Sequence, residues 1–203
     1  MQFHATVLAN RMLTCLSLFL IVGLLFFAMA CTGPAPEYQT EVTIKDIMDS
    51  VIDPNADYVW QSVSTTASSK GIVEKAPRTE DDWREVRRHT IALMEATNAL
   101  QIPGRRVARP GEKSEDPRIE EPPEVIQTII DSDRASWYKN AHGLYAAAAL
   151  LLKATDAQNV DGLVDAGDKV DKACETCHLK YWYPNQTDLF KKVAPSGSVR
   201  KTP

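Results

Sequence analysis

The residues of this chain that could do chemistry are gathered in one short run, Cys174-Glu175-Thr176-Cys177-His178. This is the C-x-x-C-H spacing typical of covalent c-type haem attachment. On a helix, positions i, i+3 and i+4 share one face. Both thiols can therefore bond to vinyl groups on one porphyrin edge, with His178 beneath the iron as the proximal ligand. The motif predicts one haem c per chain.

Three other interpretations of the motif are weaker. A zinc site requires four ligands, and the sequence holds no second cysteine pair. A thioredoxin-like redox pair requires a βαβ context, whereas the surrounding pattern is helical. A disulfide between positions three apart on a continuous helix has poor geometry.

The N-terminal segment predicts export. An apolar run from Met12 to Cys31 follows Arg11, and Ala28-Met29-Ala30 forms an A-x-A cleavage site. Cys31 resembles the lipid-accepting cysteine of bacterial lipoproteins. The run is also long enough to span a bilayer, so an uncleaved membrane anchor is the alternative. We expect an export signal over 1–30, a tether over 31–39, and a folded part on the periplasmic side of a bacterial membrane, as a lipoprotein or otherwise as a soluble periplasmic protein.

Composition supports this division. The 203 residues carry a formal charge of −4, too mild for a nucleic-acid-binding surface. Of the four cysteines, Cys15 lies inside the signal and Cys31 at its end. Only the two cysteines of the motif remain in the folded part, so no disulfide is expected.

Apolar residues at helical spacing predict the elements that must position the motif. The expected helices cover 43–52, 80–101, 124–154 and a last segment that follows the link at 156–159 and stops at Pro184. Asp53-Pro54 is expected to interrupt the first helix and start a short piece to about residue 63. Segments 64–76 and 103–123 read as loops, and no β-pattern of useful length is found. The prediction is an all-α, antiparallel four-helix bundle over 40–184, followed by a polar basic tail over 185–203.

The motif's place on the last helix resembles the class II c-type cytochromes, the cytochrome c-prime group. Tyr181, three residues after His178, and the segment IKDIMDS at Ile44–Ser50 carry the same resemblance. The resemblance implies an exported four-helix bundle with the haem near the C-terminal end of the last helix. Members of this group often form dimers, so a homodimer is one expected oligomeric state. The chain departs from the pattern at Trp182, where the family often has arginine or lysine.

The sixth iron ligand has four candidates after export: Met48, Met94, His89 and His142. In an up-down-up-down bundle, the end of the last helix meets the start of the first. Met48 lies within about 8 Å of that start, at 1.5 Å rise per residue. Low-spin members of the family also place a ligating methionine in the first helix. Met48 is therefore the predicted distal ligand, with core packing as the alternative.

The same topology brings the loop after the second helix to the haem end. Arg105, Arg106 and Arg109 are therefore candidates for pairing with haem propionates or for a basic docking patch. The alternative is that they are solvated loop charges. A basic patch would favour an acidic redox partner.

The sequence leaves two functions open. The first is an electron carrier with His/Met axial ligation, and the second is a haem protein that binds nitric oxide or carbon monoxide at an open sixth position. An enzyme is not expected, because no histidine is placed as a distal acid–base group.

Overall fold

The computed structural model describes residues 37–69 and 71–186. The chain divides into two units, Met1–Gln39 and Thr40–Pro203, and only residues 37–39 of the first unit are described. The predicted export signal, Cys31 and the tail beyond residue 186 lie outside the described residues. None of the described helices has the length and apolar character needed to cross a membrane.

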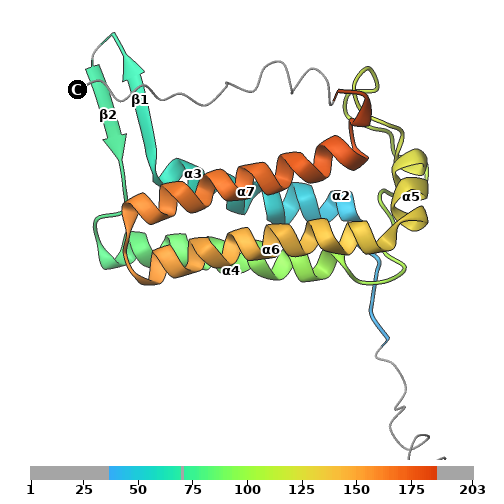
Figure 1. The fold of residues 1–203 in the computed structure, drawn as a ribbon, viewed down its shortest axis with the longest axis horizontal. Coiled ribbons are helices and arrows are strands. Elements are labelled where there is room, and N and C mark those ends of the chain that lie inside the picture. The colour runs from blue at the N-terminus through green and yellow to red at the C-terminus, as the bar shows by residue number, and fades with distance from the viewer. Residues whose placement is uncertain (1–36, 70, 187–203) are drawn as a thin grey trace, which may run out of the picture. The chain divides into compact units, whose positions relative to one another are not determined.

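The second unit holds an antiparallel four-helix bundle, as the sequence predicts (Figure 1). Its four rods are α2–η1–α3 (Ile44–Ile47, Met48–Ile52, Asp53–Ser62), α4 (Glu80–Leu100), α6 (Arg134–Asp156) and α7 (Val160–Tyr181). A 3-10 turn at Pro184–Gln186 follows α7. Consecutive rods run in opposite directions, so the ends of α4 and α7 lie beside the starts of α2 and α6 (Figure 1).

The first rod begins at a capping box. The Thr43 hydroxyl accepts from the Asp46 amide at 3.1 Å, and the Asp46 carboxylate accepts from the Thr43 amide at 2.9 Å. The next two amides, of Ile44 and Lys45, donate to carbonyls of Arg106 and Val107 in the loop after α4. All the amides exposed at this helix start therefore have local partners, and the loop is fixed to it.

The predicted short piece to about residue 63 corresponds to α3, which has Pro54 in its first turn, but the predicted interruption before it is wrong. The rod continues through Pro54 because Met48–Ile52 widens into a π-turn, in which the Asp53 amide donates to the Met48 carbonyl. Proline in a helix lacks an amide hydrogen and clashes with the carbonyl four residues earlier. A wider turn just before the proline relieves both problems.

Segment 64–76 is also not a loop. It forms an antiparallel hairpin of β1 (Ser64–Ser68) and β2 (Gly71–Lys75), with Ser64 paired to Lys75 and Ser68 to Gly71. All five residues of β2 are exposed, and Ile72 and Val73 remain 71% and 65% exposed. Strands that bury neither face need no hydrophobic alternation, so the pattern used to find strands is absent here.

The predicted helix 124–154 is two helices. α5 (Pro123–Ser132) ends at Asp133, whose carboxylate then caps α6 by accepting from the Ser136 amide at 3.0 Å. Ile126, Ile130 and Trp137 are all buried. The apolar spacing therefore continues across the break, which is why periodicity alone does not show it.

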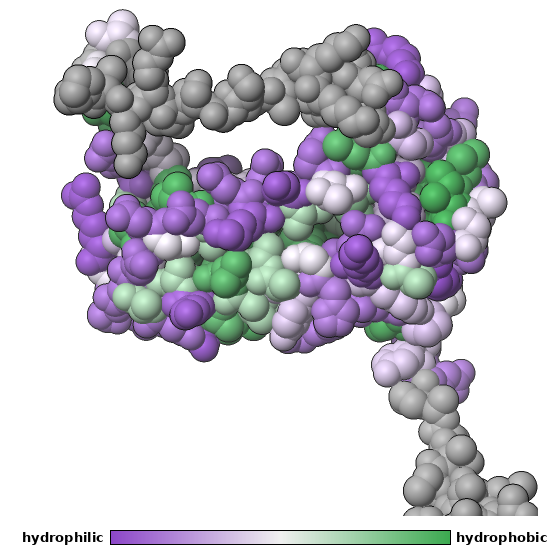
Figure 2. Space-filling model, viewed as in Figure 1, coloured by the Kyte–Doolittle hydropathy of each residue, from purple (hydrophilic) through white to green (hydrophobic). Residues whose placement is uncertain are grey.

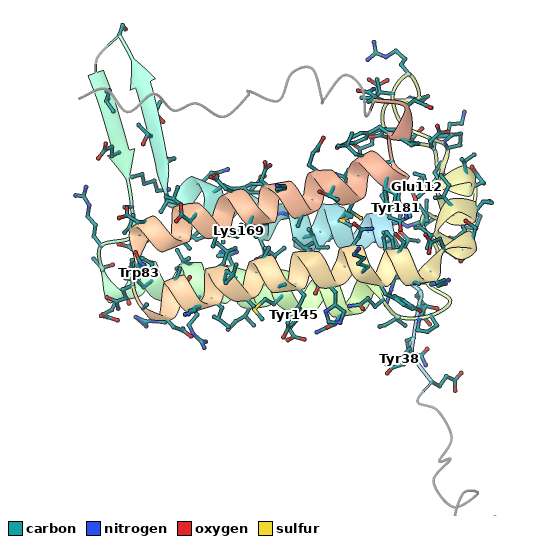
Figure 3. All side chains as sticks on the ribbon, in the orientation of Figure 1. Tyr38, Trp83, Glu112, Tyr145, Lys169 and Tyr181 are labelled. Carbon is teal, nitrogen blue, oxygen red and sulfur yellow. The ribbon has the colours of Figure 1, made fainter. Side chains whose placement is uncertain are left out.

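The core runs the length of the bundle. Trp83, near the start of α4, is buried towards one end, and Tyr181, at the end of α7, is buried at the other (Figure 3). In the view of Figure 2, charged and polar side chains cover most of the bundle surface, with smaller apolar areas between them. The bundle is therefore a rigid frame whose α7 carries the C-x-x-C-H motif at one end.

Candidate functional site

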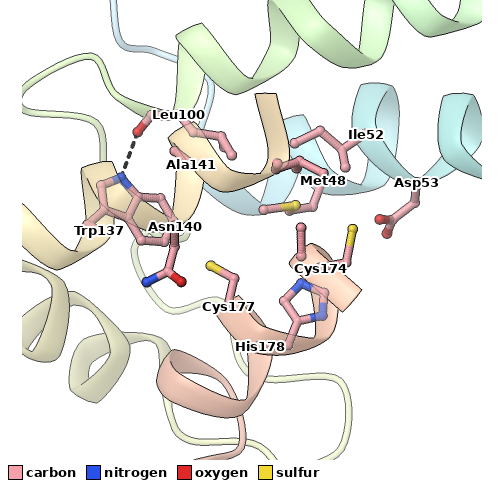
Figure 4. Close-up of a pocket in the computed structure, with 12 residues that line it drawn as sticks. Met48, Ile52, Asp53, Leu100, Trp137, Asn140, Ala141, Cys174, Cys177 and His178 are labelled. Atoms are coloured by element: carbon pink, nitrogen blue, oxygen red, sulfur yellow. Dashed lines mark hydrogen bonds between the residues drawn. The ribbon is translucent and has the colours of Figure 1, made fainter. Parts of the chain in front are cut away.

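A small cavity lies where the ends of the four rods meet. Its lining comes from the first rod, the end of α4, the start of α6 and the last turns of α7 (Figure 4). The lining residues are Met48, Ile52, Asp53, Leu100, Trp137, Asn140, Ala141, Leu144, Ala173, Cys174, Cys177 and His178. The up-down-up-down topology predicts this meeting of elements, and the structure brings all three chemical residues of the motif to it.

Cys174 and Cys177 are both free thiols whose side chains line the cavity (Figure 4). Burial, together with nearby carboxylates, chiefly that of Asp53, raises the pKa of the Cys174 thiol to about 12. Burial raises the pKa of the Cys177 thiol to about 12 as well. Both thiols are therefore protonated at neutral pH, unlike the low-pKa cysteine of a disulfide oxidoreductase. Two protonated, unpaired thiols that line one cavity fit cysteines to which a haem is attached covalently.

His178 presents a neutral imidazole to the same cavity. Burial lowers its pKa, and the charges of Glu175 and Glu120 act against that shift. A neutral imidazole is the form that binds a metal. The rings of Trp182 and Tyr183 pack around it, with centroid distances of 5.7 and 5.9 Å.

Met48 lies across the cavity from the motif. Its side chain is 9% exposed, and Figure 4 shows its thioether directed into the space that His178 and both thiols border. The residue opens the π-turn of the first rod, and π-turns inside helices occur frequently at functional sites. The structure therefore places the predicted distal candidate and the predicted proximal ligand in one cavity.

The other three sixth-ligand candidates do not line this cavity within the described part of the chain. His89 stacks on Tyr58 at a centroid distance of 3.7 Å, and its Nδ1 lies 2.7 Å from the Asn55 amide oxygen. His142 contacts Tyr145 edge-on, and Met94 packs against the core. Met48 is the candidate that remains.

This donor set fits a haem c. Two unpaired thiols three residues apart, a neutral histidine directly after them and a largely apolar cavity are the features that covalent attachment and iron ligation need. Cys174, Cys177 and His178 would hold the haem, and Met48 is the residue of the same cavity whose thioether could serve as a second iron ligand.

Comparisons with known proteins add only a general likeness. No family model matches the chain. No curated protein matches it. Among solved structures, several forms of cytochrome c prime from Alcaligenes xylosoxidans are similar to this chain. A ferrous arginine-to-phenylalanine variant with bound NO is 22% identical and covers 70% of this chain and 98% of its own, at a TM-score of 0.43.

Two more of these forms are also nitric oxide complexes. The complex of a leucine-to-valine variant is 21% identical and covers 72% and 99% of the two chains, at a TM-score of 0.44. The complex of a leucine-to-isoleucine variant is 22% identical and covers 70% and 98%, also at 0.44. The site described above is argued from the residues of this chain.

Two polar residues of the cavity were not identified from the sequence. The sequence predicts for Asp53 only a place where one helix ends and the next piece starts, yet its side chain lines the cavity, where burial raises the pKa of its carboxyl. Asn140 lines the cavity from α6 and donates to the Ser136 carbonyl at 2.9 Å. Asn140 lies one helical turn after the buried Trp137. This spacing could have predicted from the sequence that Asn140 faces the same side of the helix.

The three arginines of the loop after α4 do not form one basic patch. Arg105 is 4% exposed, and its guanidinium donates to the carbonyls of Ala99 and Val42, so the side chain is not available at the surface as a docking residue. Its pairing with a haem propionate stays a prediction. Arg109 is paired with Asp46. Only Arg106 is exposed with no salt bridge among the described residues.

Charges of both signs surround a second cavity, which shares Met48, Asp53 and His178 with the first. Its other charged lining residues are Lys45, Lys113, Asp49, Glu115 and Glu120. Lys45 is paired with Asp49, Glu112 and Glu115. Carboxylates outnumber lysines around this second cavity, so its lining carries a net negative charge. The basic patch predicted from the sequence does not lie here.

Proposed function

We propose that this protein is a c-type cytochrome that holds one haem through thioether bonds to Cys174 and Cys177, with His178 as the proximal iron ligand. The observation that carries the proposal is that these three side chains line one buried, largely apolar cavity at the end of α7. Their spacing on the helix matches the edge of a porphyrin.

We further propose that the protein is an electron carrier with Met48 as the sixth ligand. The bound haem supplies an iron that changes oxidation state by one electron. The chain contributes a fixed imidazole on α7, a thioether on the π-turn, and apolar groups such as Ile52 and Leu144 that keep water from the iron. A rigid bundle around these groups limits reorganisation when the charge changes.

We do not propose an enzyme. Catalysis of peroxide cleavage needs a positioned acid–base group on the distal side. Among the described residues that line the first cavity, Asp53 and Asn140 are the polar groups besides the motif, and no second histidine is present. Transfer of electrons to a partner protein needs no such group.

The cellular context also remains a proposal. Export, lipid attachment at Cys31 and homodimer formation rest on the sequence alone. So does an acidic redox partner, for which Lys113, which lines the second cavity and has no salt bridge among the described residues, supplies a positive charge.

The decisive experiment compares Met48→Leu with Met94→Leu in the purified holoprotein. Both replacements conserve side-chain volume, so folding is retained at a cost under about 1.5 kcal/mol. We expect a low-spin optical spectrum in the wild type and in Met94→Leu, which alters a methionine outside the cavity. Met48→Leu is expected to give a high-spin spectrum and ready binding of carbon monoxide.

A wild-type protein that is already high-spin and binds carbon monoxide readily would contradict the carrier proposal. The alternative from the sequence, a haem protein that binds nitric oxide or carbon monoxide, would then hold. An absence of covalent haem from the wild type would contradict both.

A further inference from the structure

Glu175, the first residue between the two cysteines of the motif, has an unsatisfied buried oxygen. Its Oε2 accepts a hydrogen bond from the Tyr183 hydroxyl at 3.0 Å. Its Oε1 is buried and has no hydrogen-bond partner among the described residues. An unsatisfied buried acceptor costs about 1–3 kcal/mol, and more when it is charged. Such an atom needs a donor nearby.

His178 is a group on the same helix with a ring N–H to offer. Glu175 and His178 are three residues apart on α7 and are therefore neighbours on the helix surface. Tyr183 contacts both: its hydroxyl binds the carboxylate, and its ring lies edge-on to the imidazole at 5.9 Å. The carboxylate and the imidazole thus flank the same tyrosine.

An iron-bound imidazole has one ring nitrogen left over. A histidine that binds a metal generally donates its second N–H to a carboxylate, a carbonyl or a water, which fixes the ring and strengthens its donation to the metal. Two carboxylates, Glu175 and Glu120, face His178. Oε2 of Glu120 accepts from the amides of Glu115 and Asp116, and its Oε1 is not among the buried unsatisfied atoms of the described residues. Glu175 keeps an oxygen available.

We propose that Glu175, held by Tyr183, accepts the hydrogen bond from Nδ1 of His178 and acts as a positioning residue for the proximal ligand. A carboxylate acceptor gives the imidazole partial negative character and so favours the ferric over the ferrous iron. This inference rests on the proposed haem site and adds a residue that sets its reduction potential.

The test is the midpoint potential of the holoprotein in Glu175→Gln and in Asp171→Asn. Asp171 is exposed one turn earlier on α7, so its replacement removes the same formal charge without touching the imidazole. We expect Glu175→Gln to raise the potential by about 59 mV, which corresponds to a tenfold change in relative ferric and ferrous stability. Asp171→Asn is expected to shift it by less than a third of that.

A second measurement does not depend on the potential. In the reduced protein labelled with ¹⁵N-histidine, we expect the Nδ1 proton of His178 to exchange with solvent roughly tenfold faster in Glu175→Ala than in the wild type, because an acceptor that protects it is lost. Equal potentials for Glu175→Gln and Asp171→Asn, or an unchanged exchange rate in Glu175→Ala, would overturn this inference. Both outcomes are read from haem-bearing protein, so they leave the proposed function intact, whereas a wild type without covalent haem would refute the function itself.

Discussion

Arg105 is predicted to hold the haem end of the bundle together through its guanidinium. The side chain is 4% exposed, its Nε donates to the Ala99 carbonyl at 2.9 Å, and a second nitrogen donates to the Val42 carbonyl. Ala99 lies in the last turn of α4, where carbonyls lack helical partners and the helix dipole favours a cation. One side chain thus joins the end of α4 to the chain just before the first rod.

The cost of Arg105→Met follows from these contacts. Each hydrogen bond from a charged donor contributes about 1.5–3 kcal/mol. The favourable position at the helix end adds about 0.3–1 kcal/mol. The methionine recovers part of this by burying apolar surface. We expect a net loss of about 3–4 kcal/mol in the free energy of unfolding, a large share of the total for a domain of this size.

Urea unfolding of the holoprotein, followed by far-UV circular dichroism, measures this loss as a lower midpoint at an unchanged slope. The matched control is Arg106→Met, one residue along the same loop and exposed, for which we expect a change within about 0.5 kcal/mol. The haem spectrum is expected to stay the same in both variants. Equal midpoints for the two variants would refute the structural role of Arg105, and a spectral change confined to Arg105→Met would favour a propionate contact instead.

Three further predictions concern the frame of the site. Hydrogen bonds from the Thr43 amide, and then from Arg109, lower the pKa of Asp46 to about 2. We therefore expect Asp46→Ala to cost about 1 kcal/mol above pH 4, and the difference from wild type to shrink as the pH falls towards 2 in acid titrations of stability. A constant difference would contradict the capping account. We expect Trp137→Phe to cost about 2 kcal/mol in thermal unfolding, because the buried indole N–H donates to the Leu100 carbonyl at 2.9 Å; a smaller loss than about 0.5 kcal/mol would show that this bond is dispensable. Replacing the hairpin 64–75 by a short Gly/Ser linker should leave the haem spectrum and the unfolding midpoint nearly unchanged, because its second strand buries nothing; a marked loss of stability would show that the hairpin contributes to the core.

Much of the frame could be predicted because it depends on local signals. Thr79 and the acidic residues after it start α4, and the apolar residues at helical spacing carry it to Leu100. The four-rod topology then places Met48 and His178 at the same end without further information. The C-x-x-C-H residues are close together in the sequence, so they could be identified without knowing the fold.

The remaining features depend on tertiary contacts that periodicity does not encode. Pro54 is an expected helix breaker, and only the π-turn before it shows how the rod continues. Asp133 interrupts a segment whose buried residues keep the same spacing on both sides. The sequence does not distinguish Arg105 from an exposed arginine in a loop, because its burial depends on hydrogen bonds to two carbonyls elsewhere in the chain. In each case the deciding partner is distant in the sequence or is the backbone itself.

The central claim is the covalent haem at Cys174 and Cys177, and the mass of the intact, denatured polypeptide tests it most directly. The chain should be produced in a host that exports and matures c-type cytochromes. The account predicts that the wild-type mass rises by one haem that stays with the chain on denaturation, and that the double variant Cys174→Ser/Cys177→Ser lacks this increment. A wild-type chain of unmodified mass with two titratable thiols would contradict it.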